Sequence, residues 1–465
     1  DEVVDTYDTT FGYRYTSYDA NGFLLNGERI KLQGVSMHHD QGALGSVSTR
    51  DAIERQVLIL KEMGVNAIRA THNPYAQEFI DVCNENGVLV IEEFFDGWNA
   101  PKNGNSYDYS RFFTQTIGET ELINASADMT WAQYDLQETV RRDINSPAII
   151  MWSLGNEVTE GTNGVPNFNQ HQANLIKWTK ALDTTRPVTQ GDNNIKGGGT
   201  AQNPAGIANA DGIVGLNYCS GANYDTIHAN NPSWFLYGSE TASAVNSRGV
   251  YNVTGSQQLN GDKLLTSYDK SAVGWGATAS SAWYEVIKRD FIGGTFVWTG
   301  FDYLGEPTPN NGTGAGWVNG ENSPKNSFFG IIDTAGLPKD TYYFYQSQWS
   351  DEYHTLHVLP AWSDDSSFVK KDSNGNIEVA VYTDAAGAKL VLEKADGTEV
   401  EVGAPKYFKT VTTAAGFTYQ IDENNQNSDK GLYFTWSVPY EEGTLKAVAL
   451  NADGTEIDTS SAEWQ

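Results

Sequence analysis

Eight short apolar segments of this chain are followed by side chains that can take part in catalysis or binding. These side chains are carboxylates, imidazoles, amides and aromatic rings. The chemically versatile members of this set are Glu92, Glu93, Asp96, Glu157, Asp192, Glu240, Asp302, His38, His39, His72, Arg69, Asn73, Asn156, Asn217, Tyr218 and Trp298. Their spacing is not that of a metal-ligand motif. A pair of carboxyl groups can cleave a glycosidic bond, since one protonates the leaving oxygen while the other stabilises or attacks the oxocarbenium-like carbon. The set therefore favours glycoside hydrolysis.

Glu157 and Glu240 are the strongest candidates for that pair. Glu157 follows the apolar run 149–155, and Glu240 follows the run 234–237. A carboxyl group at the end of a buried strand is partly desolvated, which raises the pKa of the group that must stay protonated. On strand position alone, a helix cap or an ion pair with an arginine remains an alternative role for either glutamate.

Alternating strand and helix patterns must position these residues. Strands are predicted at 31–39, 66–72, 88–95, 148–157, 187–192, 213–218, 234–240 and 294–303, and helices at 49–64, 76–86, 131–143, 168–183, 281–290 and 341–349. The helix after the fifth strand is not clear from the pattern. Strand-then-helix units of this number and length predict an α/β fold, the (β/α)₈ TIM barrel, whose active site lies at the carboxyl ends of the strands. An open doubly wound sheet is the alternative, which the lack of a glycine-rich phosphate loop disfavours.

The sequence changes character after Trp349. Short strand-like runs at 354–360, 377–383, 389–394, 406–411, 431–438 and 444–450 alternate with Asn-Gly and Asp-Gly turn signals. They predict an all-β, immunoglobulin-like sandwich with an accessory role. We therefore expect the tail of a preceding β domain at 1–20, the catalytic barrel at 21–350 and the sandwich at 351–465.

Composition excludes several classes of partner. With 59 acidic and 30 basic residues, the formal charge is −29, which disfavours nucleic acid and anionic membranes. Cys83 and Cys219 are the only cysteines, so neither a disulfide framework nor a zinc site is expected. No apolar run reaches 18 residues, so membrane insertion is not expected. The acidic, cysteine-poor composition suits an extracellular or cell-surface protein, with a cytoplasmic location as the alternative.

Four motifs resemble those of glycoside hydrolase family 2 and together cover the barrel. Residues 153–157 (Ser-Leu-Gly-Asn-Glu) resemble its acid/base motif, and residues 237–240 (Tyr-Gly-Ser-Glu) resemble its nucleophile strand. Residues 69–74 and 32–39 are similar to its second and first strands. The resemblance implies retention of configuration, with Glu240 as nucleophile and Glu157 as general acid/base.

The same resemblance implies sugar-binding roles. Asn156 would contact the sugar 2-hydroxyl, and Tyr218 would hydrogen-bond the nucleophile. The residues implied to line the glycone pocket are His39, His72 and Trp298. Asp192 is added from its position at a strand end, where helix capping is an alternative, and His38 is expected to be a core or supporting residue.

Residues 298–307, 328–333 and 337–340 resemble the galactosidase members of the family. They imply release of terminal β-D-galactose from a β-galactoside oligosaccharide or glycoconjugate. The glucuronidase members carry an Asn-x-Lys clamp, which residues 322–325 do not match in spacing. β-Glucuronidase or another family 2 exo-glycosidase remains the enzymatic alternative, and a non-catalytic galactan-binding protein is the alternative from another class.

Two features depart from the family pattern. The family normally carries a sugar-binding domain and an immunoglobulin-like domain before the barrel, and we expect only the tail of the latter here, around residues 11–14. The N-terminal domains of the same protein are therefore expected as partners. Some family galactosidases hold magnesium through a Glu-x-His arrangement that residues 92–98 lack. We therefore expect no obligatory cofactor and no metal site, because no ligand motif for magnesium or sodium is matched.

Overall fold

The computed structural model describes residues 3–8, 10–197, 211–309 and 325–465. A closed barrel of parallel strands forms its centre. These strands are β4 (Leu32–Met37), β5 (Ala67–Ala70), β6 (Leu89–Glu93), β7 (Ile149–Asn156), β8 (Val188–Asp192), β9 (Ile213–Asn217), β10 (Phe235–Ala242) and β11 (Ile292–Trp298). Neighbours follow chain order, and β11 pairs with β4 to close the ring. The predicted (β/α)₈ barrel is confirmed.

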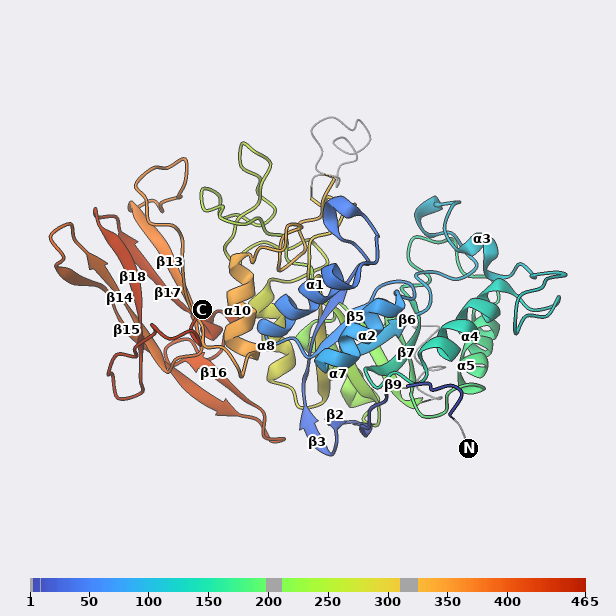
Figure 1. Ribbon diagram of the computed structural model, residues 1–465. Helices are drawn as coiled ribbons and strands as arrows, with labels where there is room; N and C mark the ends of the chain where they lie inside the picture. The colour runs from blue at the N-terminus through green and yellow to red at the C-terminus, as the bar shows by residue number, and fades with distance from the viewer. Residues whose placement is uncertain (1–2, 9, 198–210, 310–324) are drawn as a thin grey trace.

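Helices surround the barrel (Figure 1). They are α1 (Arg50–Glu62), α2 (Gln77–Asn86), α3 (Ser110–Phe113), α4 (Trp131–Asp143), α5 (Phe168–Lys180), α7 (Gly221–Asn230), α8 (Ala279–Ile287) and α10 (Asp340–Trp349). The predicted apolar face of α1, with Ile53, Val57 and Leu60, is buried. The segment after β8 continues into residues 198–210, which lie outside the described residues. No helix in the described parts of the chain is long and apolar enough to cross a membrane.

A small antiparallel sheet closes the amino-terminal end of the barrel. It comprises β1 (Thr16–Asp19), β2 (Gly22–Leu25) and β3 (Glu28–Ile30). Phe23 is fully buried in one cluster with residues that open barrel strands, such as Leu32 and Phe235. The boundary expected at residue 20 falls between β1 and β2, which pair as a hairpin. Apolar packing therefore fills this end of the barrel, while polar side chains gather at the other.

The region after α10 forms two antiparallel sheets. One has the order β12 (Leu356–Leu359), β13 (Asn376–Thr383), β17 (Phe434–Pro439), and the other β16 (Thr418–Asp422), β15 (Glu399–Thr412), β14 (Gly387–Glu393), β18 (Thr444–Leu450). Their shared core includes Val379, Leu390 and Phe434. The sandwich lies beside α8 and α10 (Figure 1), where Lys430 pairs with the buried Asp269 at 2.8 Å.

Candidate active site

A cavity of about 650 Å³ opens at the carboxyl ends of the barrel strands. Six of the residues predicted for the site lie in its wall, namely His72, Asn156, Glu157, Tyr218, Glu240 and Trp298. His38, which was expected to be a core or supporting residue, also lines it. The structure thus brings both predicted catalytic glutamates into one cavity.

Irregular backbone directs the two glutamates into this cavity. The β7–β8 register shifts between Ser153 and Asn156, and the β10–β9 register shifts between Tyr237 and Glu240. Such bulges re-aim side chains next to functional sites. Glu157 has φ +41°, in the left-handed region that non-glycine residues rarely adopt. Backbone strain of this kind is often stored where a side chain must point in one direction.

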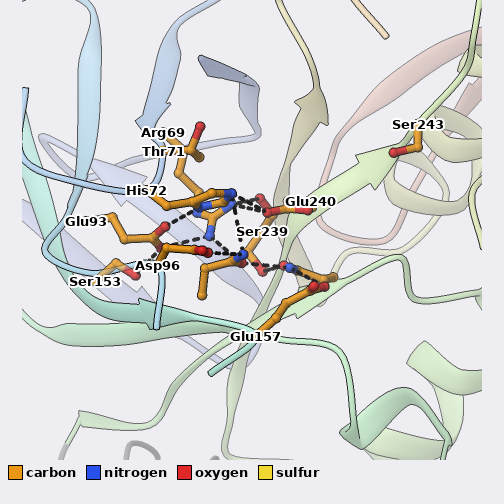
Figure 2. A network of polar contacts seen from close by, with 12 residues as sticks. Arg69, Thr71, His72, Glu93, Asp96, Ser153, Glu157, Ser239, Glu240 and Ser243 are labelled. Carbon is orange, nitrogen blue, oxygen red and sulfur yellow. Dashed lines mark hydrogen bonds and ion pairs between the residues drawn. The ribbon is translucent and has the colours of Figure 1, made fainter. Parts of the chain in front are cut away.

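Arg69 is the centre of the polar network shown in Figure 2. Its guanidinium is fully buried and donates from Nη1 to Glu240 Oε1 at 2.8 Å and from Nη2 to Glu93 Oε2 at 2.7 Å. Nη2 also donates to Asn156 Oδ1 at 3.0 Å. Burial alone would lower the pKa of Arg69, but the charges of Glu93 and Glu240 raise it. The arginine therefore gives Glu240 a fixed positive partner.

Glu93 links Arg69 to His72. It accepts hydrogen bonds from Ser153 Oγ and from His72 Nδ1, both at 2.6 Å. Burial would raise the pKa of Glu93, yet Arg69 and His72 hold it below its usual value. Burial would also lower the pKa of His72, but the hydrogen bond and charge of Glu93 raise it. The contact fixes the imidazole so that Nε2 lies 3.7 Å from Glu240 Oε1.

Glu157 has a different environment. Burial, followed by the charge of Glu240, raises the pKa of Glu157 to about 7. Asn217 opposes this rise, because its Nδ2 donates to Glu157 Oε1 at 2.9 Å and favours the ionised form. Glu157 can therefore carry a proton near neutral pH, while Glu240 is ion-paired.

The amide of Asn217 is oriented by two further contacts. Its Oδ1 accepts from Ser239 Oγ at 2.6 Å, and its Nδ2 also donates to Asn156 Oδ1 at 3.0 Å. Gly191 leaves the space for this arrangement, since a Cβ there would lie 2.8 Å from Arg69 Nη2 and 2.9 Å from Asn156 Oδ1. The acid/base candidate and the nucleophile candidate thus share one buried hydrogen-bond network.

Aromatic rings form another side of the cavity. The Trp298 indole stacks on His72 at 5.3 Å and 8°, and His38 meets Trp298 edge-on at 5.1 Å. Burial, followed by the charge of His72, lowers the pKa of His38 to about 3, so His38 is neutral. The Tyr218 hydroxyl accepts a hydrogen bond from Ser243 Oγ at 2.9 Å. Burial and the charge of Glu240 raise the pKa of Tyr218 well above its usual value.

Two predicted sugar-binding residues do not line this cavity. His39 Nε2 contacts Ser48 Oγ at 2.7 Å, and its ring packs beside Tyr75 in a neighbouring hollow. The chain leaves β4 after Met37, so it is His38 that reaches the cavity. Asp192 accepts the backbone N–H groups of Asn194 and Ile195 and is buried. It caps the following turn, which was the alternative role.

The two glutamates at the end of β6 do not fit a divalent cation. Glu92 pairs with Arg142 at 3.2 Å, and Glu93 pairs with Arg69 and His72. Burial and the charge of Asp143 raise the pKa of Glu92 well above its usual value, which favours its neutral form. A metal ion would have to displace the cationic partners of Glu93. In the parts of the chain that the structure describes, no group of three or more His, Cys, Asp or Glu side chains could hold a metal ion.

Comparisons with known proteins agree with this geometry. Residues 18–211 match the model of the glycosyl hydrolases family 2 TIM barrel domain, and residues 374–458 match a domain of unknown function. The beta-galactosidase BoGH2A of Bacteroides ovatus is 36% identical over 97% of this chain and 50% of its own length. A putative beta-glucuronidase of Formosa agariphila is 32% identical over 96% of this chain and 39% of its own length.

Among solved structures, a beta-glycosidase from Bacteroides vulgatus superposes with a TM-score of 0.71 at 27% identity. The match covers 96% of this chain and 51% of that protein. The chain thus spans about half the length, or less, of the relatives it matches. The family model, the related sequences and the solved structure agree, and the chain belongs to glycoside hydrolase family 2.

Proposed function

We propose that this protein hydrolyses terminal β-galactosides with retention of anomeric configuration. The observation that carries the proposal is the unequal setting of two carboxyl groups in one cavity. Glu240 is ion-paired with the buried Arg69 at 2.8 Å, while burial raises the pKa of Glu157 to about 7. Carboxyl groups with such different environments suit the roles of nucleophile and acid.

The proposed reaction has two displacements. A Glu240 oxygen attacks the anomeric carbon, the bond to the leaving oxygen breaks, and Glu157 gives that oxygen its proton. Water then attacks the anomeric carbon of the glycosyl-enzyme, Glu157 takes a proton from that water, and the bond from the sugar to Glu240 breaks to release Glu240 as a carboxylate. The Asn156 amide, held by Arg69 and Asn217, is positioned to contact the sugar 2-hydroxyl.

Galactosides are favoured over glucuronides by charge at the cavity wall. Burial would raise the pKa of Asp96, but His72 and Lys102 hold it below its usual value, so Asp96 is an anion. That carboxylate would repel the carboxylate of a glucuronide. Lys102 offsets part of this charge, because its ammonium donates to Asp96 at 2.6 Å, but the cavity wall also holds the carboxyl groups of Glu160 and Glu306. The relative named as a beta-galactosidase supports the same specificity.

β-Glucuronidase is the second candidate, and Lys196 is the observation that favours it. Its ammonium lies in the same cavity, 5.3 Å from the centre of the Tyr218 ring, where it could meet a substrate carboxylate. The putative beta-glucuronidase relative points the same way. Residues 322–324, where the clamp spacing differs from that of glucuronidases, lie outside the described residues.

The test compares initial rates on nitrophenyl β-galactoside, β-glucuronide and β-mannoside. We expect kcat/KM to be at least about tenfold higher for the galactoside, which corresponds to about 1.4 kcal/mol of transition-state binding. A higher kcat/KM for the glucuronide would refute β-galactosidase activity as the proposed function and favour β-glucuronidase activity. Full activity in Glu240→Gln, or release of product with inverted configuration, would overturn the mechanism itself.

A further inference from the structure

Lys102 lies in the wall of the cavity and has no part in the reaction steps above. Its side chain is 14% exposed, and a buried charge is unfavourable unless polar partners surround it. The ammonium has two such partners, since Nζ donates to Asp96 Oδ1 at 2.6 Å and to the backbone carbonyl of Asn156 at 2.7 Å. Hydrogen bonds from a charged donor are the stronger kind. The lysine therefore joins the segment after β6 to the end of β7.

The two partners of Lys102 are also bonded to each other. The Asn156 N–H donates to Asp96 O at 3.3 Å, and Asn156 Nδ2 donates to Asp96 Oδ1 at 3.4 Å. Asn156 is the last residue of β7 and is 4% exposed, so its carbonyl group needs a donor from within the protein. Lys102 supplies this donor at a point beyond the last residue of β6.

The Asn156 carbonyl belongs to the peptide group that leads into Glu157. The N–H of the same peptide group is that of Glu157, and it donates to Gly191 O at 2.9 Å. Lys102 and Gly191 therefore hold both polar atoms of this peptide group. The left-handed φ of Glu157, +41°, costs free energy and persists only where surrounding contacts impose it. Loss of the ammonium would let this backbone relax and move the Glu157 carboxyl.

The segment that carries Lys102 is attached to the segment that follows Glu157. The Lys102 N–H donates to Asp108 Oδ2 at 3.0 Å, and the Asn103 N–H donates to Gly161 O at 2.9 Å. Glycine at position 161 allows this approach, because a Cβ there would lie 2.1 Å from Asn103 Oδ1. Supporting contacts of this kind keep a catalytic group in its productive geometry.

The charge of Lys102 acts on Glu157 as well. Burial and the charge of Glu240 raise the pKa of Glu157 to about 7, while Asn217, Lys102 and His72 oppose that rise. Other ionisable groups surround Glu157 from several elements, namely His72 after β5, Tyr218 after β9, Glu240 in β10, and Asp96, Glu160, Lys196 and Glu306 elsewhere in the cavity wall. Among the three groups that oppose the rise, Lys102 is the one that also bonds to the backbone leading into Glu157.

We propose that Lys102 is a positioning residue for the acid/base step, which holds the peptide group between Asn156 and Glu157 so that the Glu157 carboxyl faces the leaving oxygen. The inference rests on the proposed function, and Lys102 acts in it through Asn156 and Asp96 without touching the sugar. Loss of the ammonium should therefore harm proton donation by Glu157 and spare the attack by Glu240.

The test measures kcat/KM of Lys102→Met, which keeps a stem of similar length without the charge, on two galactosides. Methyl β-galactoside has a poor leaving group that needs the acid, whereas dinitrophenyl β-galactoside has a good one that does not. At about pH 6, where Glu157 is mostly protonated, kcat/KM should fall by about tenfold or more for the methyl galactoside and by no more than about twofold for the dinitrophenyl galactoside.

The pH profile gives a second readout, which a merely structural lysine would not change. The basic limb on methyl β-galactoside should move to higher pH in Lys102→Met, because a charge that favours the Glu157 carboxylate has been removed. Lys102→Arg keeps a cationic donor and should lose less activity on the methyl galactoside than Lys102→Met.

Lys180→Met is the matched control. Lys180 Nζ also donates to a backbone carbonyl, that of Arg186 at 3.0 Å, and to a carboxylate, that of Asp211 at 3.0 Å, but it lies at the end of α5 and not in the cavity wall. This variant should keep both values of kcat/KM and the basic limb.

Three results in Lys102→Met would overturn the positioning role and leave the proposed function standing. They are an equal fall on both galactosides, no fall on either, and a basic limb that stays in place. Failure of the unaltered protein on both galactosides would overturn the proposed function and this inference together.

Discussion

Asn217 offers a quantitative test of how the network sets the protonation of Glu157. Its Nδ2 donates to Glu157 Oε1 at 2.9 Å, and the bond favours the ionised carboxylate against burial and the charge of Glu240. Asn217→Ala removes that donor. A hydrogen bond to a charged group contributes about 1.5–3 kcal/mol, less where water can replace it, and about 1.4 kcal/mol equals one pKa unit. We therefore expect the pKa of Glu157 to rise by about one unit.

The assay is the pH dependence of kcat/KM on a galactoside with a poor leaving group, because its basic limb reports the acid of the free enzyme. The limb is expected near pH 7 in the unaltered protein and about one unit higher in Asn217→Ala. Ser239→Ala is the matched control, since it removes the donor to Asn217 Oδ1 and keeps the donor to Glu157; its limb should move less. A limb that stays in place, or moves to lower pH, would refute the reasoning.

Three further changes test other parts of the site. Glu157→Ala should lower kcat/KM for a poor leaving group by about 10²–10⁴-fold, with azide restoring turnover of an activated galactoside; a lack of rescue would argue against an acid/base role. Glu93→Leu should lower the unfolding free energy by about 3–5 kcal/mol, because it leaves Arg69 half-paired. The pKa of Glu93 is held below 4.5, so the contribution of Glu93 to the unfolding free energy is complete above this pH and is lost as the pH falls. Calorimetry of both proteins at several pH values measures this contribution. The same difference in unfolding free energy at every pH would contradict the prediction. Gly191→Ala should impair activity, because the added Cβ would crowd Arg69. The control is Gly261→Ala, which should keep full activity because a Cβ at this position meets nothing within 4 Å. Equal rates in the two variants would refute the crowding argument.

The barrel was predictable because its strands are continuous apolar runs and most of its helices bury a regular face. α7 was missed because it buries only Gly221, Tyr224 and Ile227, which leaves no apolar stripe for periodicity to detect. β16 was missed for a related reason, since only its last two residues are buried. Both elements bury few side chains, so the periodicity of apolar residues in the sequence gives little indication of where they lie.

The site was predictable where a residue ends a strand. Glu157 and Glu240 lie in the cavity as expected, but His38 lines it where His39 was named. The alternation of side chains between the two faces of a strand cannot predict which of these two histidines faces the cavity, because the strand ends before them, at Met37. Asn217 and Arg69 were noted at strand ends without roles, since their partners lie on other strands. An arginine within the apolar segment 67–70 was the available signal for a buried ion pair.

Trp275 also lines the cavity, and its place there could not be anticipated, because it lies at a turn in the long connection between β10 and α8. Its position depends on hydrogen bonds from the backbone of its turn to the carbonyl groups of Ala242 and Ser243. The pattern of side chains in the sequence does not reveal such backbone hydrogen bonds. The same holds for the orientation of Asn217, which Ser239 fixes through one hydroxyl. Pairings between distant segments are therefore what the structure adds to the sequence.

Trapping of the glycosyl-enzyme tests the central claim most directly. A 2-deoxy-2-fluoro β-galactosyl fluoride forms the covalent intermediate and slows its hydrolysis, so that peptide mass spectrometry can locate the label. We predict one galactosyl label per chain, on Glu240, with loss of activity in step with labelling. A label on another residue, or a protein that turns over galactosides and is never labelled, would contradict the account.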